Sequence, residues 1–418
     1  MPSAAPNAPT NRRLSLILAG LAMIGPFSID TMFPAFAQIG AQFAADKLAM
    51  QQTISAYLFA YAAMSLVHGP LSDAIGRRRV ILGGLLLFAL ASAGCALSTS
   101  LPMLLFFRVL QGLSAGVGFV VGRAVIRDVR QGDDAQRLLS QVSMIFSIAP
   151  AVAPVIGGWL LGWERWPAIF WFLVLLSLGL ALLVWRSLPE THPPAARMPF
   201  HAGPLLRGYL AIVRSPRFLR LSAAGALNFG ALFLYIASAP AFVVDLMGLN
   251  ERQFGWFFIP MIGGMTLGAF VSGRSAGRID GTRLAGIGFA CCGLAALLNI
   301  GYNLLVQSPS VPWAVLPSSL NAFGIALVFP IITLAILDMY PRQRGGASSM
   351  QAFIGLMLNA VIAGMLSPLL SHHGLHLALG AAAFTALGWL VWRWELSSGA
   401  HALRTSPDAA ALEPTDEL

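Results

Sequence analysis

The sequence predicts an all-α polytopic membrane protein in which twelve transmembrane helices form two sets of six. Of its 418 residues, 57% are hydrophobic and only 10% are charged, whereas soluble domains carry about 25% charged residues. Apolar runs long enough to cross a bilayer recur along the chain, and basic residues gather in alternate loops between them. A soluble protein is excluded, because such a chain would expose apolar patches far larger than soluble proteins tolerate.

Twelve apolar runs have the length of a transmembrane helix, which needs about 20 residues. They cover residues 14–37, 49–71, 80–98, 101–123, 137–161 and 166–187, then 218–244, 254–276, 283–305, 312–338, 345–370 and 373–394. The segment between the two sets is rich in proline and basic residues and is typical of a linker. We therefore predict an N-terminal tail (1–13), a six-helix bundle (14–187), a cytoplasmic linker (188–217), a second six-helix bundle (218–394) and a disordered tail (395–418).

The basic residues predict the orientation of these helices. Of the 26 Lys and Arg residues, 22 fall in the termini and in loops on one side, three (Lys47, Arg165 and Arg252) fall on the other side, and Arg108 lies within a helix. Basic loops remain in the cytoplasm, so both termini are expected there. Membrane orientation also explains the net charge of +9, and we expect no nucleic-acid partner.

The N-terminus has some features of a secretory signal peptide, namely Arg12 and Arg13, an apolar run and a small-residue site around Phe36. The run is too long for a signal peptide and contains Asp30. Cleavage would also leave eleven helices and break the charge asymmetry. We therefore expect the first run to be retained as a transmembrane helix.

Asp30 is the only acidic residue deep within an apolar run of the first half. A carboxylate near the bilayer midplane costs about 2.5–3.5 kcal/mol, so it marks either a functional site or a structurally paired group. Pro26, Asp30 and Pro34 recur at intervals of four and share one helix face. Each proline frees the carbonyl four residues before it, and the resulting polar face predicts the lining of a cavity.

Arg108 is the corresponding basic residue in the fourth run. It lies about seven residues from the outer end of its helix, as Asp30 does, which places both side chains about 10 Å deep. Equal depth allows an electrostatic interaction between them; a contact does not follow from the sequence. An arginine in this position requires a partner or water. Helix packing alone explains the glycines around Arg108 well, but it does not explain Arg108 itself.

The polar residues within the second set of runs are neutral, which distinguishes this half from the first. We assign to a substrate cavity the polar and aromatic residues Phe27, Pro34, Tyr57, Tyr61, Gln111, Asn228, Tyr235, Asn321, Gln351 and Asn359. For Tyr57 and Tyr61, which lie on one helical stripe, anchoring at the lipid interface is an equally good interpretation.

The chain lacks the motifs of an enzyme or a metal centre. It has no glycine-rich phosphate loop, hydrolase elbow or Cys–His metal set. The cysteines lie inside apolar runs and favour packing, and a hydrated turn is a better interpretation of His372, His373 and His376 than a metal site. We expect no enzymatic activity and no cofactor.

Two further segments have unusual compositions. Residues 69–79, Gly-Pro-Leu-Ser-Asp-Ala-Ile-Gly-Arg-Arg-Arg, form a tight charged loop that makes the second and third helices antiparallel neighbours. The segment 149–158 of the fifth run contains two prolines and two glycines, a pattern that kinks a membrane helix and lets it pack closely.

These motifs together resemble the major facilitator superfamily of transporters. The resemblance to the superfamily rests on a loop signature (Gly69, Asp73, Gly76, Arg77, Arg78), a fourth-helix motif (Arg108-Val-Leu-Gln111-Gly112) and an antiporter motif of the fifth helix (Pro150, Pro154, Gly157, Gly158). Three segments are similar to the drug/proton antiporter branch of the Bcr/CflA, or bicyclomycin-resistance, type: Ser28-Ile-Asp30-Thr-Met-Phe-Pro34-Ala, Gly122-Arg123-Ala-Val-Ile-Arg127-Asp128 and Gln253-Phe-Gly255-Trp256. The resemblance covers residues 14–394. Ala74 departs from the pattern, because a basic residue is frequent there.

The resemblance implies a multi-pass exporter of the bacterial inner membrane, with two six-helix bundles, each an inverted pair of three-helix repeats, around a central cavity. It implies alternating access with a proton gradient as the energy source, and small amphiphilic substrates such as antibiotics. It implies no cofactor. We expect a monomer. Asp30 is expected to carry the proton under the influence of Arg108. Asp73 is expected to stabilise the outward-open state, with Arg77 or Arg127 as its partner.

Two alternatives remain open from the sequence. The first is a proton-coupled importer or a narrow metabolite exporter on the same fold. The second is a membrane receptor or scaffold that transports nothing, which the short tail after Glu395 makes less attractive. A single buried acid among neutral polar and aromatic residues is compatible with neutral and cationic lipophilic compounds, so the substrate does not follow from the sequence.

Overall fold

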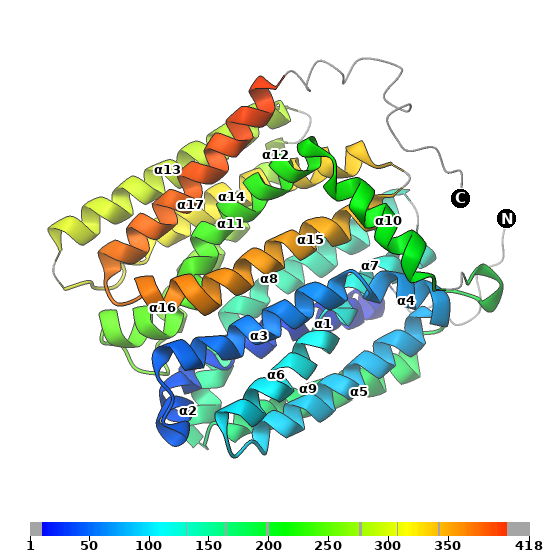
Figure 1. Ribbon diagram of the computed structural model, residues 1–418, viewed down its shortest axis with the longest axis horizontal. Helices are drawn as coiled ribbons and strands as arrows, with labels where there is room; N and C mark the ends of the chain where they lie inside the picture. The colour runs from blue at the N-terminus through cyan, green and yellow to red at the C-terminus, as the bar shows by residue number, and fades with distance from the viewer. Residues whose placement is uncertain are drawn as a thin grey trace.

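The computed structural model describes residues 11–398, apart from residues 131, 164, 198–199, 276–277, 307 and 342. The predicted N-terminal tail and the tail after residue 398 therefore lie largely outside the described residues. Within them the chain is helical, and the helices group into two bundles that follow one another in sequence (Figure 1).

The first half contains the helices of the first six predicted runs. They are α1 (Asn11–Asp30) with η1 (Phe33–Ala35) and α2 (Phe36–Phe43), α3 (Lys47–Ser65) with α4 (His68–Ile75), α5 (Arg77–Ala96), α6 (Leu101–Ala115) with α7 (Val117–Val129), α8 (Gly132–Trp163) and α9 (Pro167–Ser187). The second half contains α11 (Pro216–Ala237) with η3 (Ala241–Leu246), α12 (Gly255–Ser275), α13 (Gly281–Leu305), α14 (Leu316–Met339), α15 (Arg344–Val361) with η4 (Ile362–Leu366) and α16 (Ser367–Leu370), and α17 (Gly374–Ser397).

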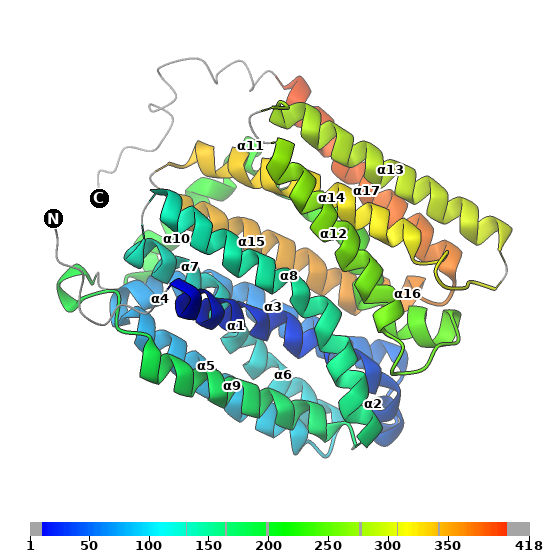
Figure 2. The ribbon, with the colours of Figure 1, turned by 180° about the vertical axis from the view of Figure 1, so that it is seen from behind.

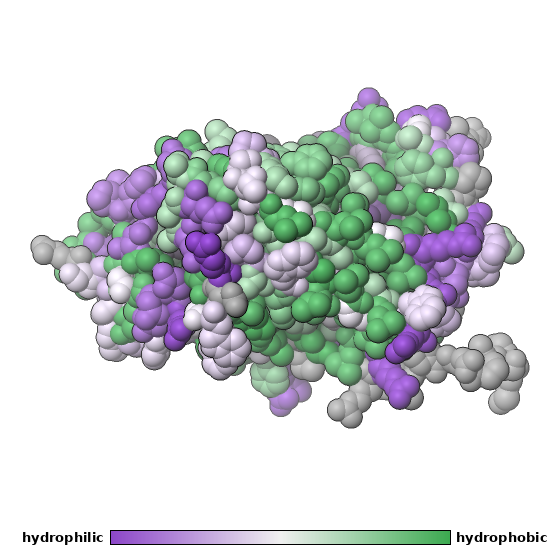
Figure 3. Space-filling view, turned by 90° about the horizontal axis from the view of Figure 1, so that it is seen from below, coloured by the Kyte–Doolittle hydropathy of each residue, from purple (hydrophilic) through white to green (hydrophobic). Residues whose placement is uncertain are grey.

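These elements confirm the prediction of twelve membrane-crossing segments. Ten segments of the described chain are long and apolar enough to span a bilayer unaided. An eleventh consists of α3 and α4, which are bent by 48° relative to each other, and the twelfth is α8, whose outer part Ile148–Trp163 is apolar. On the face that Figure 3 shows, a broad apolar band lies between two polar ends. Large side chains on the predicted spans, such as Leu90, Leu175 and Leu297, are each 70% exposed, as expected where lipid covers them.

The helix breaks have local causes. Pro34 has no N–H to donate to the carbonyl of Asp30, and α1 ends at Asp30 before a 3-10 turn that begins at Phe33. Asp46, Ser100 and Ser215 are N-caps whose side chains accept backbone N–H bonds from the first turns of α3, α6 and α11. The predicted kink in the fifth helix does not interrupt it, because α8 runs through Pro150 and Pro154 as one helix.

The two bundles meet along two pairs of helices, α3 with α15 and α8 with α12 (Figures 1 and 2). The polar contacts between the halves that the described residues make all lie towards one end, which we call the Lys47 end. They are Lys47–Asp245, Gln51–Ala237, Gln52–Gly364, Ser55–Ala360 and Arg252–Gly162. The polar contacts that join the two halves directly, among the described residues, therefore cluster at the Lys47 end.

The predicted linker contains a helix that the sequence analysis missed. After η2 (Pro194–Ala196), α10 (Ala202–Val213) lies across the end opposite the Lys47 end. The Tyr209 hydroxyl donates a hydrogen bond of 2.8 Å to the carbonyl of Leu66, and Tyr209 also packs near Gly346 of α15. Burial raises the pKa of Tyr209 to about 12, so its hydroxyl remains a donor at physiological pH. The helical spacing of Leu205, Tyr209 and Ile212 was visible in the sequence within a segment otherwise rich in proline and charge.

Candidate functional site

Asp30 is the last residue of α1 and is only 4% exposed. Its carboxylate has no hydrogen-bond or ion-pair partner among the described residues, although Tyr57 lies within electrostatic range. The carbonyl of the next residue, Thr31, is in close contact with Gly157 of α8. An ionised carboxylate in such a position is costly unless a partner or a proton neutralises it. The chain thus contains a buried acid with no counter-charge in contact.

Arg108 lies on α6 and is fully buried. Its Nε donates to the Thr53 carbonyl at 3.1 Å, and its Nη1 donates to the Ser28 carbonyl at 3.0 Å and the Ser28 hydroxyl at 2.8 Å. The guanidinium also lies 4.4 Å from the centre of the Tyr57 ring. The charge of Arg108 is therefore met by neutral oxygens and an aromatic face, while its Nη2 has no partner among the described residues.

Asp30 and Arg108, which were expected to interact electrostatically, are connected through Ser28 and not by a direct contact. No ion pair within 4.0 Å joins Asp30 and Arg108 in the described chain. Ser28, two residues before Asp30 on the same helix, binds Arg108 instead. Tyr57 lies within electrostatic range of both Asp30 and Arg108, so Ser28 and Tyr57 connect their surroundings.

Gln111 and Tyr57 hold Arg108 in place. The amide oxygen of Gln111 accepts a 2.8 Å bond from Arg108, and its amide nitrogen donates a 2.7 Å bond to Ser92. The Tyr57 hydroxyl donates to the Gly25 carbonyl at 3.0 Å, which fixes the ring beneath the guanidinium. Both residues are fully buried inside the first bundle. Their observed role is to position Arg108, which neither the cavity assignment nor lipid anchoring of Tyr57 anticipated.

The other cavity residues predicted in the first half, Phe27, Pro34 and Tyr61, lie in three different surroundings. Phe27 packs against Phe172 of α9 inside the first bundle, with ring centroids 6.5 Å apart, so it does not face the second bundle. Pro34 is buried in η1 below Asp30. Tyr61 is half-buried and packs edge-to-face on Tyr57 at 6.2 Å. Of these three residues only Tyr61 is open to the space beside its helix.

The predicted polar residues of the second half form a neutral cluster rather than a second charged site. Tyr235 accepts a 2.7 Å bond from Asn299, and both line a cavity of about 10 Å³ together with Asn321. That volume is enough for about one water molecule. Gln351 donates to Thr333 at 3.1 Å. Asn228, Asn321 and Asn359 are buried, and each has an amide oxygen without a partner in the described residues. The network partner Asn299 was missed by the sequence analysis.

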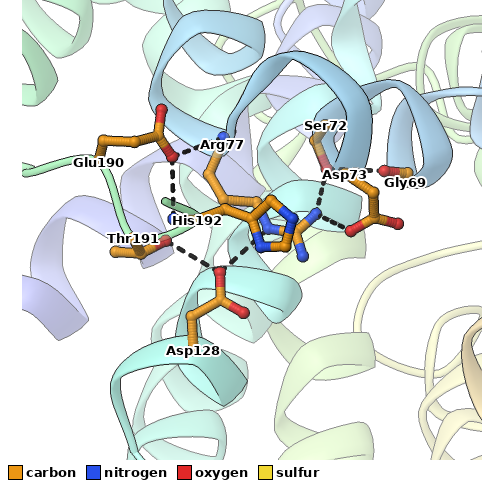
Figure 4. A network of polar contacts seen from close by, with 8 residues as sticks. All are labelled: Gly69, Ser72, Asp73, Arg77, Asp128, Glu190, Thr191 and His192. Carbon is orange, nitrogen blue, oxygen red and sulfur yellow. Dashed lines mark hydrogen bonds and ion pairs between the residues drawn. The ribbon is translucent and has the colours of Figure 1, made fainter. Parts of the chain in front are cut away.

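The charged loop forms a second polar network in the first half (Figure 4). Arg77 is 6% exposed and binds Asp73 at 2.5 Å, Asp128 at 3.0 Å and the Ser72 hydroxyl at 2.6 Å. Its backbone N–H donates to Glu190 at 2.8 Å. The partner of Asp73 is therefore Arg77 and not Arg127.

The rest of the loop motif supports this network. The Ser72 hydroxyl donates to the Gly69 carbonyl, and Arg78 donates to the Trp185 carbonyl. Gly76 has a φ of 111°, a conformation that favours glycine, and any side chain there would meet Glu190. Glu190, from the start of the predicted linker, was not identified from the sequence, because nothing local indicated that it would return to this loop.

The glycines of the fifth-helix motif lie between elements. A side chain at Gly157 would overlap the Thr31 carbonyl next to Asp30. A side chain at Gly158 would overlap the Glu251 carbonyl of the opposite half. These two positions place α8 directly between the buried acid and the second bundle.

Comparison with known proteins agrees with this architecture. The Major Facilitator Superfamily profile matches residues 18–355. The chain belongs to the major facilitator superfamily. As a member of a family of transporters it is a multi-pass membrane transporter of small molecules and not an enzyme.

Relatives within the superfamily confirm the resemblance to the Bcr/CflA branch. The uncharacterized MFS-type transporter YdgK of Bacillus subtilis is 30% identical over 355 residues, which cover 84% of this chain and 87% of the relative. A bicyclomycin resistance protein homolog of Haemophilus influenzae is 26% identical over 365 residues, covering 84% and 88%. Multidrug resistance protein D of Escherichia coli K12 is 29% identical over 356 residues, covering 81% and 84%.

Solved structures of the same fold include transporters of different kinds. A bacterial homolog of the human lysosomal transporter Spinster, in an inward-facing and occupied conformation, has a TM-score of 0.71 at 16% identity, covering 97% of this chain and 100% of that one. A D-xylose–proton symporter has a TM-score of 0.69 at 12% identity, covering 92% and 97%. These similarities confirm the twelve-helix fold and carry no information on substrate or direction.

Proposed function

We propose that this protein is a proton-coupled exporter of small amphiphilic compounds, antibiotics among them, that works by alternating access. The observation that carries the proposal is Asp30, a buried carboxyl with no counter-charge in contact, in a chain whose relatives include proteins named for bicyclomycin and multidrug resistance. The proton gradient would be the only energy source, and the protein would act as a monomer with no cofactor.

The orientation of the transporter follows from its charges. The arginine-rich loop at Arg77 and the helix α10 lie opposite the Lys47 end, and basic loops remain in the cytoplasm. Both termini would then be cytoplasmic in the bacterial inner membrane, and the Lys47 end would face the periplasm. The polar contacts between the halves at the Lys47 end support an inward-facing state that admits substrate from the cytoplasm.

In this state Asp30 would exchange its proton for substrate. The neutral carboxyl is stable in the buried site, whereas the ionised form needs compensation. Arg108 binds Ser28, which lies two residues before Asp30 on α1. A small shift of α1, as the two bundles rock against each other, would bring the guanidinium closer to the Asp30 carboxyl and favour release of the proton. The network of Asp73 and Arg77 would stabilise one of the two end states, because its ion pairs join α4, α5 and α7 at their cytoplasmic ends.

The proposal is tested by proton release in inverted membrane vesicles on addition of amphenicols, bicyclomycin-like compounds or lipophilic cations. Export coupled to protons predicts compound-triggered proton movement in the wild type and none in Asp30→Asn. Proton movement of the opposite sign would indicate an importer of the kind that the shared fold also supports. An unchanged coupled response in folded Asp30→Asn would remove Asp30 from the mechanism.

A further inference from the structure

Arg123 and Arg127 lie on α7, in the cytoplasmic half of its membrane span, and both are exposed. The sequence analysis used them only as indicators of membrane orientation. Arg123 lies 4.0 Å above the ring of Phe119, one helical turn earlier. Neither arginine has an ion-pair partner among the described residues. The nearest acid in sequence, Asp128, is already bound by Arg77 and Thr191.

The packing of α7 shows which way these arginines face. Gly118 and Gly122 pack on α1, Gly116 packs on Tyr61 and His68, and Val117 packs on Gly84 of α5. At about 100° per residue, Phe119, Arg123 and Arg127 share one face, which points away from the contacts of Gly118 and Gly122 with α1 and continues the side on which Gly116 meets Tyr61. An unpaired arginine facing lipid at this depth would be costly, so this face is expected to line a water-accessible cleft on the cytoplasmic side.

A continuous row of side chains leads from Arg123 to the buried site. Tyr61 lies within electrostatic range of Arg123 and packs edge-to-face on Tyr57. Tyr57 carries Arg108 on its ring and lies within electrostatic range of Asp30. The rings of Tyr61 and Tyr57 therefore connect the surroundings of Arg123 with the residues proposed to exchange protons.

Two like charges one helical turn apart, with no acid in contact among the described residues, destabilise a helix. Such an arrangement attracts anions, and arginine beside an aromatic ring suits a carboxylate carried on an aromatic body. We propose that Arg123, assisted by Arg127, Phe119 and Tyr61, forms a subsite for the anionic group of amphiphilic substrates. The subsite extends the proposed function, on which it rests, from neutral and cationic compounds to aromatic carboxylates.

The test uses two probes of the same aromatic body, a lipophilic carboxylate and its neutral methyl ester. Binding to purified protein in nanodiscs is compared for wild type, Arg123→Gln, Arg123→Lys and Arg79→Gln. Arg79, on α5, is an exposed arginine of the same side and serves as the matched control. Loss of one charge-assisted contact predicts that Arg123→Gln weakens carboxylate binding about tenfold or more and ester binding less than about twofold.

The subsite also predicts that Arg123→Lys and Arg79→Gln bind the carboxylate within about threefold of wild type, and that high salt weakens only the carboxylate. Equal losses for both probes in Arg123→Gln would show a structural role and overturn the proposal. Wild-type protein that binds the carboxylate no more tightly than the ester would overturn it as well. Proton release triggered by the ester in vesicles tests the exporter separately, so the two failures are distinguishable.

Discussion

Arg77 provides the most demanding test of the energetics of this structure. Arg77→Met keeps most of the volume of the side chain and removes its charge. The substitution breaks the ion pairs with Asp73 and Asp128 and the hydrogen bond to Ser72. The backbone bond from residue 77 to Glu190 remains, so the effect reports on the guanidinium alone.

The size of the effect follows from the exposure of the partners. The Arg77 side chain is 8% exposed, while those of Asp73 and Asp128 are 35% and 19% exposed. Removing one partner of a fully buried pair costs about 3–5 kcal/mol, and exposed pairs contribute about 0.2–1 kcal/mol. The network lies between these limits, so we expect Arg77→Met to lower the free energy of unfolding by about 2–3 kcal/mol.

The assay is the free energy of unfolding in mixed micelles titrated with sodium dodecyl sulfate. Arg79→Met is the matched control, because Arg79 is exposed, and it should change the free energy by less than about 0.5 kcal/mol. In the background of Arg77→Met, Asp128→Asn should cost less than it does in wild type, with a coupling of about 1–2 kcal/mol. Equal effects of Arg77→Met and Arg79→Met, or strictly additive effects, would refute the reasoning.

Two further predictions concern contacts between elements. Ser55→Ala removes a buried bond between the two halves and should shift the equilibrium away from the state closed at the Lys47 end by about 0.5–1.5 kcal/mol, read from spin-label distances across that end. Ser65→Ala, which removes a bond within α3, should leave those distances unchanged. Gly157→Val overlaps the Thr31 carbonyl and should cost about 1–3 kcal/mol and reduce export. Gly179→Val, where the structure leaves space, should do neither, and wild-type stability and export in Gly157→Val would contradict the packing argument.

Much of the fold could be predicted because a bilayer imposes simple rules. Each crossing requires a long apolar run, and arginines remain on one side, so the twelve segments followed from composition alone. The helix α10 was missed because it lies outside the membrane, where no such rule applies. Its two buried residues, Tyr209 and Ile212, lie in a segment rich in prolines and charges.

The candidate site was predicted in part. Counting residues along each helix gave the depth of Asp30 and Arg108, but rotation about the helix axis decides which side chains meet. Ser28 and Asp30 differ by about 200° in direction at nearly the same depth, and Arg108 binds Ser28. The contact between Arg77 and Glu190 joins residues 113 positions apart and depends on the path of the chain after α9, which no local pattern specifies.

The central claim is that Asp30 exchanges a proton for substrate. Its most direct test is proton release in inverted vesicles of wild type and Asp30→Asn, with reconstituted protein of both variants shown to be folded and to bind the compound. The account predicts proton release on addition of an exported compound in wild type and none in Asp30→Asn, whose binding is retained. Proton release of equal size and rate in Asp30→Asn would contradict it.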